Sequence, residues 1–194
     1  METGFFAAFS KKVISTIIAI GSMFYSTIDG VIPEMTLNEI AFESDYCIVS
    51  TVITNCYTAE LDQILASGNE IPIHFDIELY KTDEREPDST FSFFHLLKFS
   101  PLENNYKIFL SEKNEVINGL NLQQAKTLFT NIIDHRILSS KDIEIDTEYY
   151  LIITAWLDKI QLQGMEEELN LIYYWNSIKP NTMSPIFTKS DFQS

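Results

Sequence analysis

Apolar and polar residues alternate along much of the chain beyond residue 35. Ile71–Leu79 carries an apolar side chain at every second position, and Phe91–Phe99 repeats the pattern before Pro101. Because successive side chains of a strand point to opposite faces, this spacing predicts two half-buried strands. Tyr46–Thr54 is rich in β-branched residues and predicts another strand, and Tyr149–Leu157, apolar on both faces, predicts a central strand. Shorter strands are predicted at Thr36–Phe42, Tyr106–Leu110 and Leu169–Trp175.

Two segments replace this alternation with helical spacing. The first runs from Thr58, a capping residue, through Ser67, and Gly68 predicts its end. The second follows Asn121, and its apolar residues recur every three or four positions as far as Ile133. About seven strands, mostly joined as hairpins, with two helices predict a mainly β (α+β) fold. We expect an antiparallel β-sandwich with two helical insertions.

The amino terminus has the charge order of a secretory signal. Lys11 and Lys12 precede the uncharged run 13–28. As a helix, this run is about 24 Å long, which is short against the ~30 Å of bilayer hydrocarbon. We therefore expect residues 1–28 to be a signal peptide or signal-anchor helix. We expect 29–194 to form one β-rich domain in the periplasm or at the periplasmic face of the inner membrane. The alternative is a core helix within a cytosolic domain.

The charge balance restricts the partners of the chain. Its 28 Asp+Glu outnumber 13 Lys+Arg, which gives a net charge of −15 and argues against a nucleic-acid partner. Hydrophobic residues make up 45% of the chain, so it can bury enough apolar surface to fold. Residues 1–28 carry a net charge of +1, which leaves −16 for the remainder. Because that charge disfavours docking on anionic lipid, we expect membrane contact only through residues 13–28, if they are not cleaved.

Few residues have the spacing of a catalytic or metal-binding motif. His74, His95 and His135 form no compact histidine motif. Cys47 and Cys56 lie near opposite ends of one predicted strand, about 25–30 Å apart, whereas a disulfide needs Cα atoms within about 7 Å. We interpret them as buried thiols. We expect no catalytic residue, no metal ligand and no cofactor.

Aromatic residues that fall on the sheet faces opposite the predicted core are the candidate binding surface. One interpretation is a two-sided core whose second face is covered by the helices. The other is a groove or patch that receives a peptide, a lipid or a partner strand. The residues concerned are Tyr80, Phe94, Tyr150, Trp156, Tyr174 and Trp175.

Several landmarks follow one another in a recognisable order. The helix LDQILASG at Leu61–Gly68 is followed by the strand IPIHFDIEL at Ile71–Leu79, and the late strand YLIITAWLD ends at Asp158. This order resembles the domain-of-unknown-function 4390 family of exported bacterial proteins, over about Thr36 to Ser177. The resemblance implies export and a β-rich fold, and it carries over no catalytic residue. The family tends to place Trp and Arg after the long strand, whereas Thr82–Asp88 contains no Trp.

Three functions are compatible with these patterns. The first is a non-enzymatic binding module for a protein partner in the cell envelope, which accords with the export signal and the missing catalytic motifs. The second is a carrier of an apolar small molecule or lipid, with aromatic residues lining a cavity. The third is a hydrolase whose carboxylates are brought together by the fold.

Overall fold

The computed structural model describes residues 30–43, 45–162 and 166–193. The expected signal or anchor at 1–28 lies outside these residues. The described ranges form eleven strands, all paired antiparallel, and two α-helices. The predicted mainly β fold with two helices is therefore confirmed, with more strands than the expected seven.

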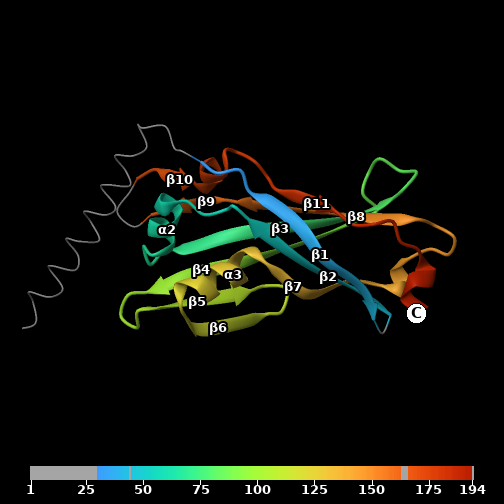
Figure 1. The fold of residues 1–194 in the computed structure, drawn as a ribbon, viewed down its shortest axis with the longest axis horizontal. Coiled ribbons are helices and arrows are strands. Elements are labelled where there is room, and N and C mark those ends of the chain that lie inside the picture. The colour runs from blue at the N-terminus through green and yellow to red at the C-terminus, as the bar shows by residue number, and fades with distance from the viewer. Residues whose placement is uncertain (1–29, 44, 163–165, 194) are drawn as a thin grey trace, which may run out of the picture.

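The strands form three sheets (Figure 1). The six-stranded sheet has the order β11-β8-β3-β4-β5-β6, the three-stranded sheet the order β1-β2-β7, and β9 pairs with β10. The strands are β1 (Glu34–Glu43), β2 (Tyr46–Thr54), β3 (Glu70–Lys81), β4 (Ser89–Ser100), β5 (Asn105–Leu110), β6 (Glu115–Leu120), β7 (Ile132–Ser139), β8 (Tyr149–Leu157), β9 (Lys159–Gln161), β10 (Glu168–Asn170) and β11 (Asn181–Met183). The helices are α2 (Ala59–Leu65) and α3 (Leu122–Thr130), with 3-10 turns η1 (Ser140–Asp142), η2 (Leu171–Trp175) and η3 (Lys189–Gln193).

Strand β3 is the centre of the larger sheet and has the predicted alternation. It pairs with β4 on one side and β8 on the other, and its residues are alternately buried and half-buried from Ile71 to Tyr80. The apolar set from Ile71 to Leu79 is at most 1% exposed. These residues define the inner face of the sheet, and the other set of side chains defines its outer face.

The core lies on the inner side of the six-stranded sheet. One cluster of buried residues combines the inner face with Cys47, Val49 and Ile53 of β2, from the three-stranded sheet that crosses it in Figure 1. Both helices contribute to the same cluster. Helix α2 contributes Leu61, Ile64 and Leu65, and helix α3 contributes Ala125 and Phe129. Both helices therefore use their apolar sides on the inner face.

The helix starts agree with the predicted caps, but the end of the second helix does not. Thr58 accepts a hydrogen bond from the Leu61 amide, and Asn121 forms a capping box with Gln124. Helix α3 ends at Thr130, whereas the apolar stripe predicted continuation through Ile133. Ile132–Ser139 instead forms β7, which pairs with β2. Ile132 and Ile133 continue the apolar spacing of the helix in the sequence, but in the structure they belong to a strand.

The predicted strand Leu169–Trp175 is also corrected. Strand β10 ends at Asn170, and the next five residues form the 3-10 turn η2. The Asn170 side chain accepts from the Ile172 amide, and Asn176 adopts a left-handed conformation with φ of 49°. The side chain of Asn170 therefore favours a turn where apolar content alone predicts extension.

Candidate functional site

The outer face of the six-stranded sheet carries a row of aromatic rings that we call the aromatic ladder: Trp156, His74, Phe94 and Phe109. The strand register places His74 opposite both Trp156 and Phe94. The His74 ring stacks on Trp156, with centroids 5.2 Å apart and an interplanar angle of 14°. The ladder continues from His74 to Phe94 at 6.1 Å and from Phe94 to Phe109 at 5.9 Å. Strands β8, β3, β4 and β5 thus present four neighbouring rings.

The ladder is half-buried and has charged groups at one end. The His74 side chain is 28% exposed, and its Nε2 lies 3.5 Å from Asp158 Oδ2. Lys179 Nζ lies 4.9 Å from the centroid of the Trp156 ring, a cation–π geometry. At the other end, Val116 of β6 is 54% exposed opposite Phe109. The face therefore combines apolar contact area with hydrogen-bonding and charged groups, a combination common in protein interfaces.

Two of the predicted aromatic residues form a second pair on the same face. The rings of Tyr80 and Tyr150 stack at 5.3 Å with an interplanar angle of 9°. The Tyr80 hydroxyl donates to Glu78 Oε2 at 3.2 Å. Desolvation and the Glu78 charge raise the pKa of Tyr80. Both rings are half-buried.

Tyr174 and Trp175 do not lie on this face. They belong to η2, are 4% and 1% exposed, and are part of the core. Trp175 Nε1 donates to the carbonyl of Cys56 at 2.8 Å. Their assignment to a candidate surface followed from the strand predicted at Leu169–Trp175, which the 3-10 turn replaces. The structure thus places four of the six predicted aromatic residues on the outer face and two inside.

A second polar cluster lies inside the core at His95, which the sequence placed on the apolar face of its strand. His95 and Glu112 side chains are 1% and 2% exposed, with His95 Nε2 3.3 Å from Glu112 Oε1. The other ring nitrogen lies 3.1 Å from the carbonyl oxygen of Phe129 at the end of α3. Glu112 Oε2 is buried without a hydrogen-bond partner in the described part of the chain. Sequence analysis missed Glu112 because a single acid in a short connection is usually solvated.

The geometry of this cluster requires a proton between its partners. A carbonyl oxygen only accepts, so His95 Nδ1 carries hydrogen. A neutral ring would then turn the lone pair of Nε2 toward a carboxylate oxygen. Either the ring or the acid therefore holds one more proton. The neighbouring His95 and His135 hold the pKa of Glu112 below its usual value despite its burial. A buried pair of this kind depends on both partners.

Acid is expected to destabilise the fold through Glu112 and His135. Burial opposes ionisation of Glu112, but the neighbouring His95 and His135 and a backbone hydrogen bond hold its pKa below the usual value. Desolvation, with the charges of Lys113 and His95, lowers the pKa of His135 despite the opposing Glu112 charge. Both groups bind protons more readily in the unfolded chain, so stability is lost as pH falls below about 6.5 toward 4. Urea unfolding midpoints should decrease over this range.

The matched control is His135→Gln, which removes one titrating group from the half-buried site. Its unfolding midpoint should change less between about pH 7 and pH 5 than that of the wild type. An identical slope for the two proteins over this interval would contradict the assignment to His135.

The cysteines agree with their interpretation as buried thiols. Cys47 and Cys56 are free and buried. Burial raises the pKa of Cys47 to about 12 and that of Cys56 to about 11. Both are therefore protonated at neutral pH, which makes them poor nucleophiles.

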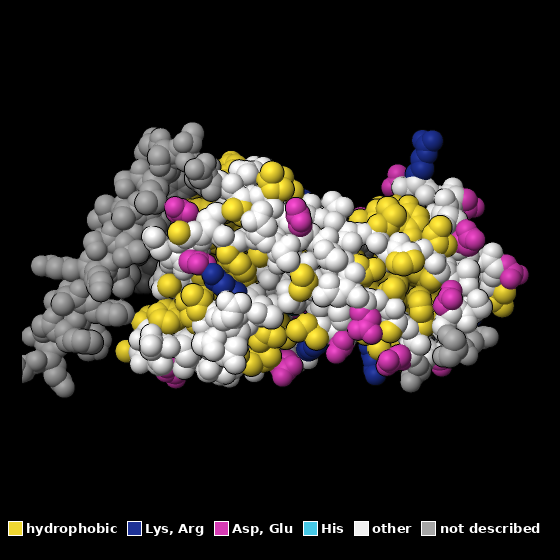
Figure 2. All heavy atoms as spheres, in the orientation of Figure 1, with side chains coloured by type: hydrophobic (Ala, Val, Ile, Leu, Met, Phe, Trp, Pro, Cys, Tyr) yellow, Lys and Arg dark blue, Asp and Glu magenta, His cyan; other side chains and the backbone are white. Residues whose placement is uncertain are grey.

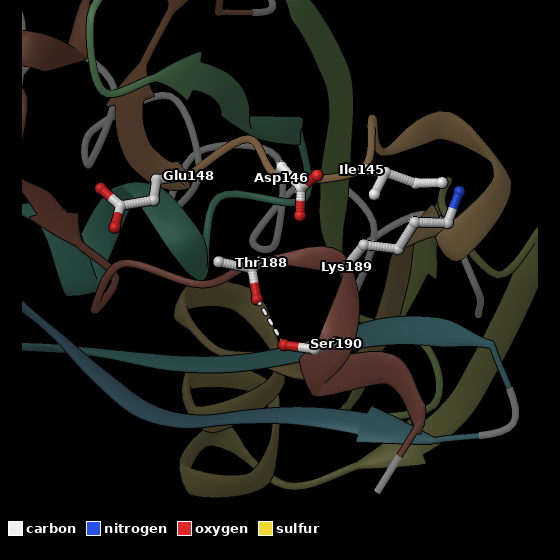
Figure 3. Close-up of a pocket in the computed structure, with 6 residues that line it drawn as sticks. All are labelled: Ile145, Asp146, Glu148, Thr188, Lys189 and Ser190. Atoms are coloured by element: carbon white, nitrogen blue, oxygen red, sulfur yellow. Dashed lines mark hydrogen bonds between the residues drawn. The ribbon is translucent and has the colours of Figure 1, made fainter.

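Two surface hollows lie away from the aromatic ladder and the His95 cluster. One, of about 540 Å³, is lined by Ile145, Asp146, Glu148, Thr188, Lys189 and Ser190 (Figure 3). Its Thr188 and Ser190 hydroxyls are hydrogen bonded to each other at 2.7 Å, and Lys189 donates to the Ile143 carbonyl. Each of these three side chains therefore already has a hydrogen-bond partner. The other, of about 430 Å³, lies between β1 and β11. Within residues 30–43, 45–162 and 166–193, no three His, Cys, Asp or Glu side chains are placed to hold a metal ion.

The model of one protein family matches residues 34–165, a segment that runs from β1 past β9. The chain belongs to the DUF4390 family. The family is described as "Domain of unknown function (DUF4390)". The expected resemblance is thereby confirmed. No curated protein and no solved structure matches the chain. Among the residues that the structure describes, no helix of this DUF4390 protein is long and apolar enough to cross a membrane.

Proposed function

We propose that this DUF4390 protein is a non-enzymatic binding module of the bacterial cell envelope, and that its aromatic ladder docks a protein partner. The observation that carries the proposal is the ladder itself. Trp156, His74, Phe94 and Phe109 form a continuous row on a sheet face to which neither α2 nor α3 contributes. A second core on this face would bury these rings under another element, whereas each of them keeps part of its surface exposed.

The composition of the face favours a protein partner. A few residues supply most of the binding energy of a protein interface, and Trp and Tyr are enriched among them. Lys179 and Asp158 flank the Trp156 end with opposite charges, which can fix the orientation of a docked surface. The two hollows described above are lined by residues other than those of the ladder and the Tyr pair.

The proposal places the domain in the periplasm or at the periplasmic face of the inner membrane. It is supported by the charge order of Lys11, Lys12 and the apolar run 13–28. In this proposal the three-stranded and six-stranded sheets act as the two layers of a β-sandwich. The single core cluster, which draws on both sheets, supports that reading.

Trp156→Ala is expected to weaken partner capture by about 30-fold or more, as for a hot-spot aromatic residue. The experiment is site-specific photocrosslinking from position 96 of the outer face in intact cells, followed by identification of the crosslinked protein. Recovery of the same partner by wild type in repeated experiments, and its loss in the variant, is the expected result. Spheroplast protease accessibility of the chain gives its compartment in the same preparation.

The matched control is Tyr173→Ala, which removes an aromatic side chain that is 50% exposed in η2 and is not part of the ladder. Capture by this variant should equal that of the wild type. Equal loss in both variants, or no reproducible partner for the wild type, would overturn the docking proposal.

A further inference from the structure

The outer face of the six-stranded sheet extends well beyond the aromatic ladder along β3. The outward side chains of this strand, all of them half-buried, are Pro72, His74, Asp76, Glu78 and Tyr80. The face therefore has an aromatic region on each side of a polar one, with the ladder at His74 and the stacked tyrosine pair at Tyr80. These two residues are six positions apart, which corresponds to about 20 Å along a strand.

The smaller sheet and the helices lie on the other side of the six-stranded sheet. Buried residues of α2, α3, β2 and β7 belong to the same core cluster as the inward side chains of β3. Figure 2 shows the molecule from that side, with hydrophobic side chains in several groups and acidic side chains around them. These elements therefore leave the outer face free for a partner.

Two carboxylates occupy the polar region between the aromatic ones. The Ser92 hydroxyl donates to Asp76 Oδ1 at 2.6 Å, and the Tyr80 hydroxyl donates to Glu78 Oε2 at 3.2 Å. Neither carboxylate forms an ion pair with another residue that the structure describes. Both negative charges are thus available to cations of a docked partner.

The cations of this face lie at the ladder and on its far side. Lys98 and Lys107 are opposite each other on β4 and β5, and Lys98 pairs with Glu70 at 3.2 Å. Lys179 lies over the Trp156 ring. A basic side chain of a partner is therefore repelled from the ladder and attracted to the polar region, which fixes its place relative to the apolar contacts.

The kind of element that fits follows from the backbone of the sheet. β3 is paired with β4 and β8, so its outer face offers a partner side chains rather than free N–H and C=O groups. An extended segment laid on the face would leave its own backbone groups unpaired, whereas an α-helix satisfies most of its own. At 1.5 Å per residue, the ~20 Å between the two aromatic regions correspond to about 13 residues of helix.

A second copy of the chain fits this face less well than a basic partner. Face-to-face pairing of two copies would bring the carboxylates of both polar regions together. Each copy also carries a net charge of −15. Like charges placed opposite each other in an interface oppose association.

We propose that the docked part of the partner is a basic amphipathic helix that lies along β3. Its apolar side chains contact the aromatic ladder at one end and the tyrosine pair at the other, and Lys or Arg side chains between them pair with Asp76 and Glu78. Positions i, i+4, i+7, i+11 and i+14 of a helix form one such stripe, with the basic residues at i+4 and i+7. The inference rests on the proposed function, since it specifies the partner of the ladder.

The test measures the binding of three fluorescent eighteen-residue peptides to the full-length chain. The contact stripe of the first reads Leu, Lys, Lys, Leu, Leu at the spacing given above, with Ala and Gln elsewhere. The second has Glu in place of both Lys residues, and the third has a central Ala replaced by Pro, which breaks the helix. The first peptide should bind saturably, gain helical circular dichroism, and bind at least about tenfold more tightly than either of the others.

Two double variants locate the binding. Asp76→Asn with Glu78→Gln should weaken the first peptide by about tenfold or more, because the amides still accept hydrogen bonds but carry no charge. The matched control is Glu39→Gln with Glu43→Gln, which removes the same charge from exposed positions of β1 and should bind as the wild type does. Equal weakening by the two double variants, or equal binding of the three peptides, would overturn the inference.

The outcome for the ladder is read separately. Trp156→Ala should weaken the first peptide by about tenfold or more, because its ring forms the apolar contact at one end of the helix. Absent binding of this peptide, or binding that does not depend on Asp76 and Glu78, would show that the partner is not a basic helix. Photocrosslinking in intact cells would still decide, on its own result, whether the ladder docks a protein.

Discussion

Glu112→Ala is expected to lower the free energy of unfolding by about 3–5 kcal/mol. Glu112 and His95 are almost fully buried and lie 3.3 Å apart. His95 Nδ1 is engaged with the Phe129 carbonyl, so removal of Glu112 leaves Nε2 facing a cavity without a partner. The loss combines an uncompensated buried polar group with the space vacated by the side chain. Urea unfolding at neutral pH, followed by fluorescence, measures the effect.

The matched control for this prediction is Glu112→Gln. Its amide nitrogen can donate to the lone pair of a neutral His95 ring, so the proton that the native pair requires is supplied by the amide. This variant should recover most of the lost stability and remove the part of the acid sensitivity that Glu112 causes. If Glu112→Ala and Glu112→Gln are equally unstable, or if neither differs from the wild type, the proton-holding pair is the wrong description.

Trp175→Ala is expected to cost about 3–5 kcal/mol, the range for removal of a large buried aromatic side chain. Trp175 is 1% exposed and is among the largest fully buried side chains. Its Nε1 donates to the Cys56 carbonyl at 2.8 Å, which ties η2 to the segment between β2 and α2. The variant therefore opens a cavity and also leaves a buried carbonyl unpaired.

Trp175→Phe separates the two contributions. It keeps a ring in the cavity but cannot donate to Cys56, so a loss of about 1–3 kcal/mol is expected from the unpaired carbonyl together with some lost packing. Thermal and urea unfolding of both variants give the comparison. A larger loss for the phenylalanine variant than for the alanine variant would contradict this division.

The sequence predicts strands well where one face is buried. At β3 the period of two extends over nine residues, and the structure has the same alternation. Prediction fails where a helix and a strand share one apolar stripe, as at Ile132 and Ile133. It fails again at Leu171–Trp175, because the Asn170 side chain accepts a hydrogen bond from the Ile172 amide and favours a 3-10 turn over a strand. The first case depends on the pairing of β7 with β2, and the second on a local side-chain hydrogen bond. Apolar periodicity contains information on neither.

The candidate site is harder to predict, because it depends on register. Sequence alternation places Phe94 and Trp156 on one side of their strands, but it does not show that His74 lies between them. Phe109 joins the row only through the pairing of β5 with β4. Glu112 offers no signal in the sequence, because its burial follows from the position of the connection between β5 and β6 over the core. To predict which residues are neighbours across a sheet, one needs the strand order and register as well as the pattern within each strand.

If the chain is exported as proposed, its buried thiols have a kinetic consequence. In the folded domain Cys47 and Cys56 are inaccessible and protonated, and disulfide exchange requires an accessible thiolate. An unfolded chain that emerges into an oxidising compartment exposes both sulfurs at once. Native folding and thiol oxidation therefore compete for the same molecules during the interval before β2 is covered. The faster the core closes over β2, the smaller the fraction of chains trapped by a non-native disulfide.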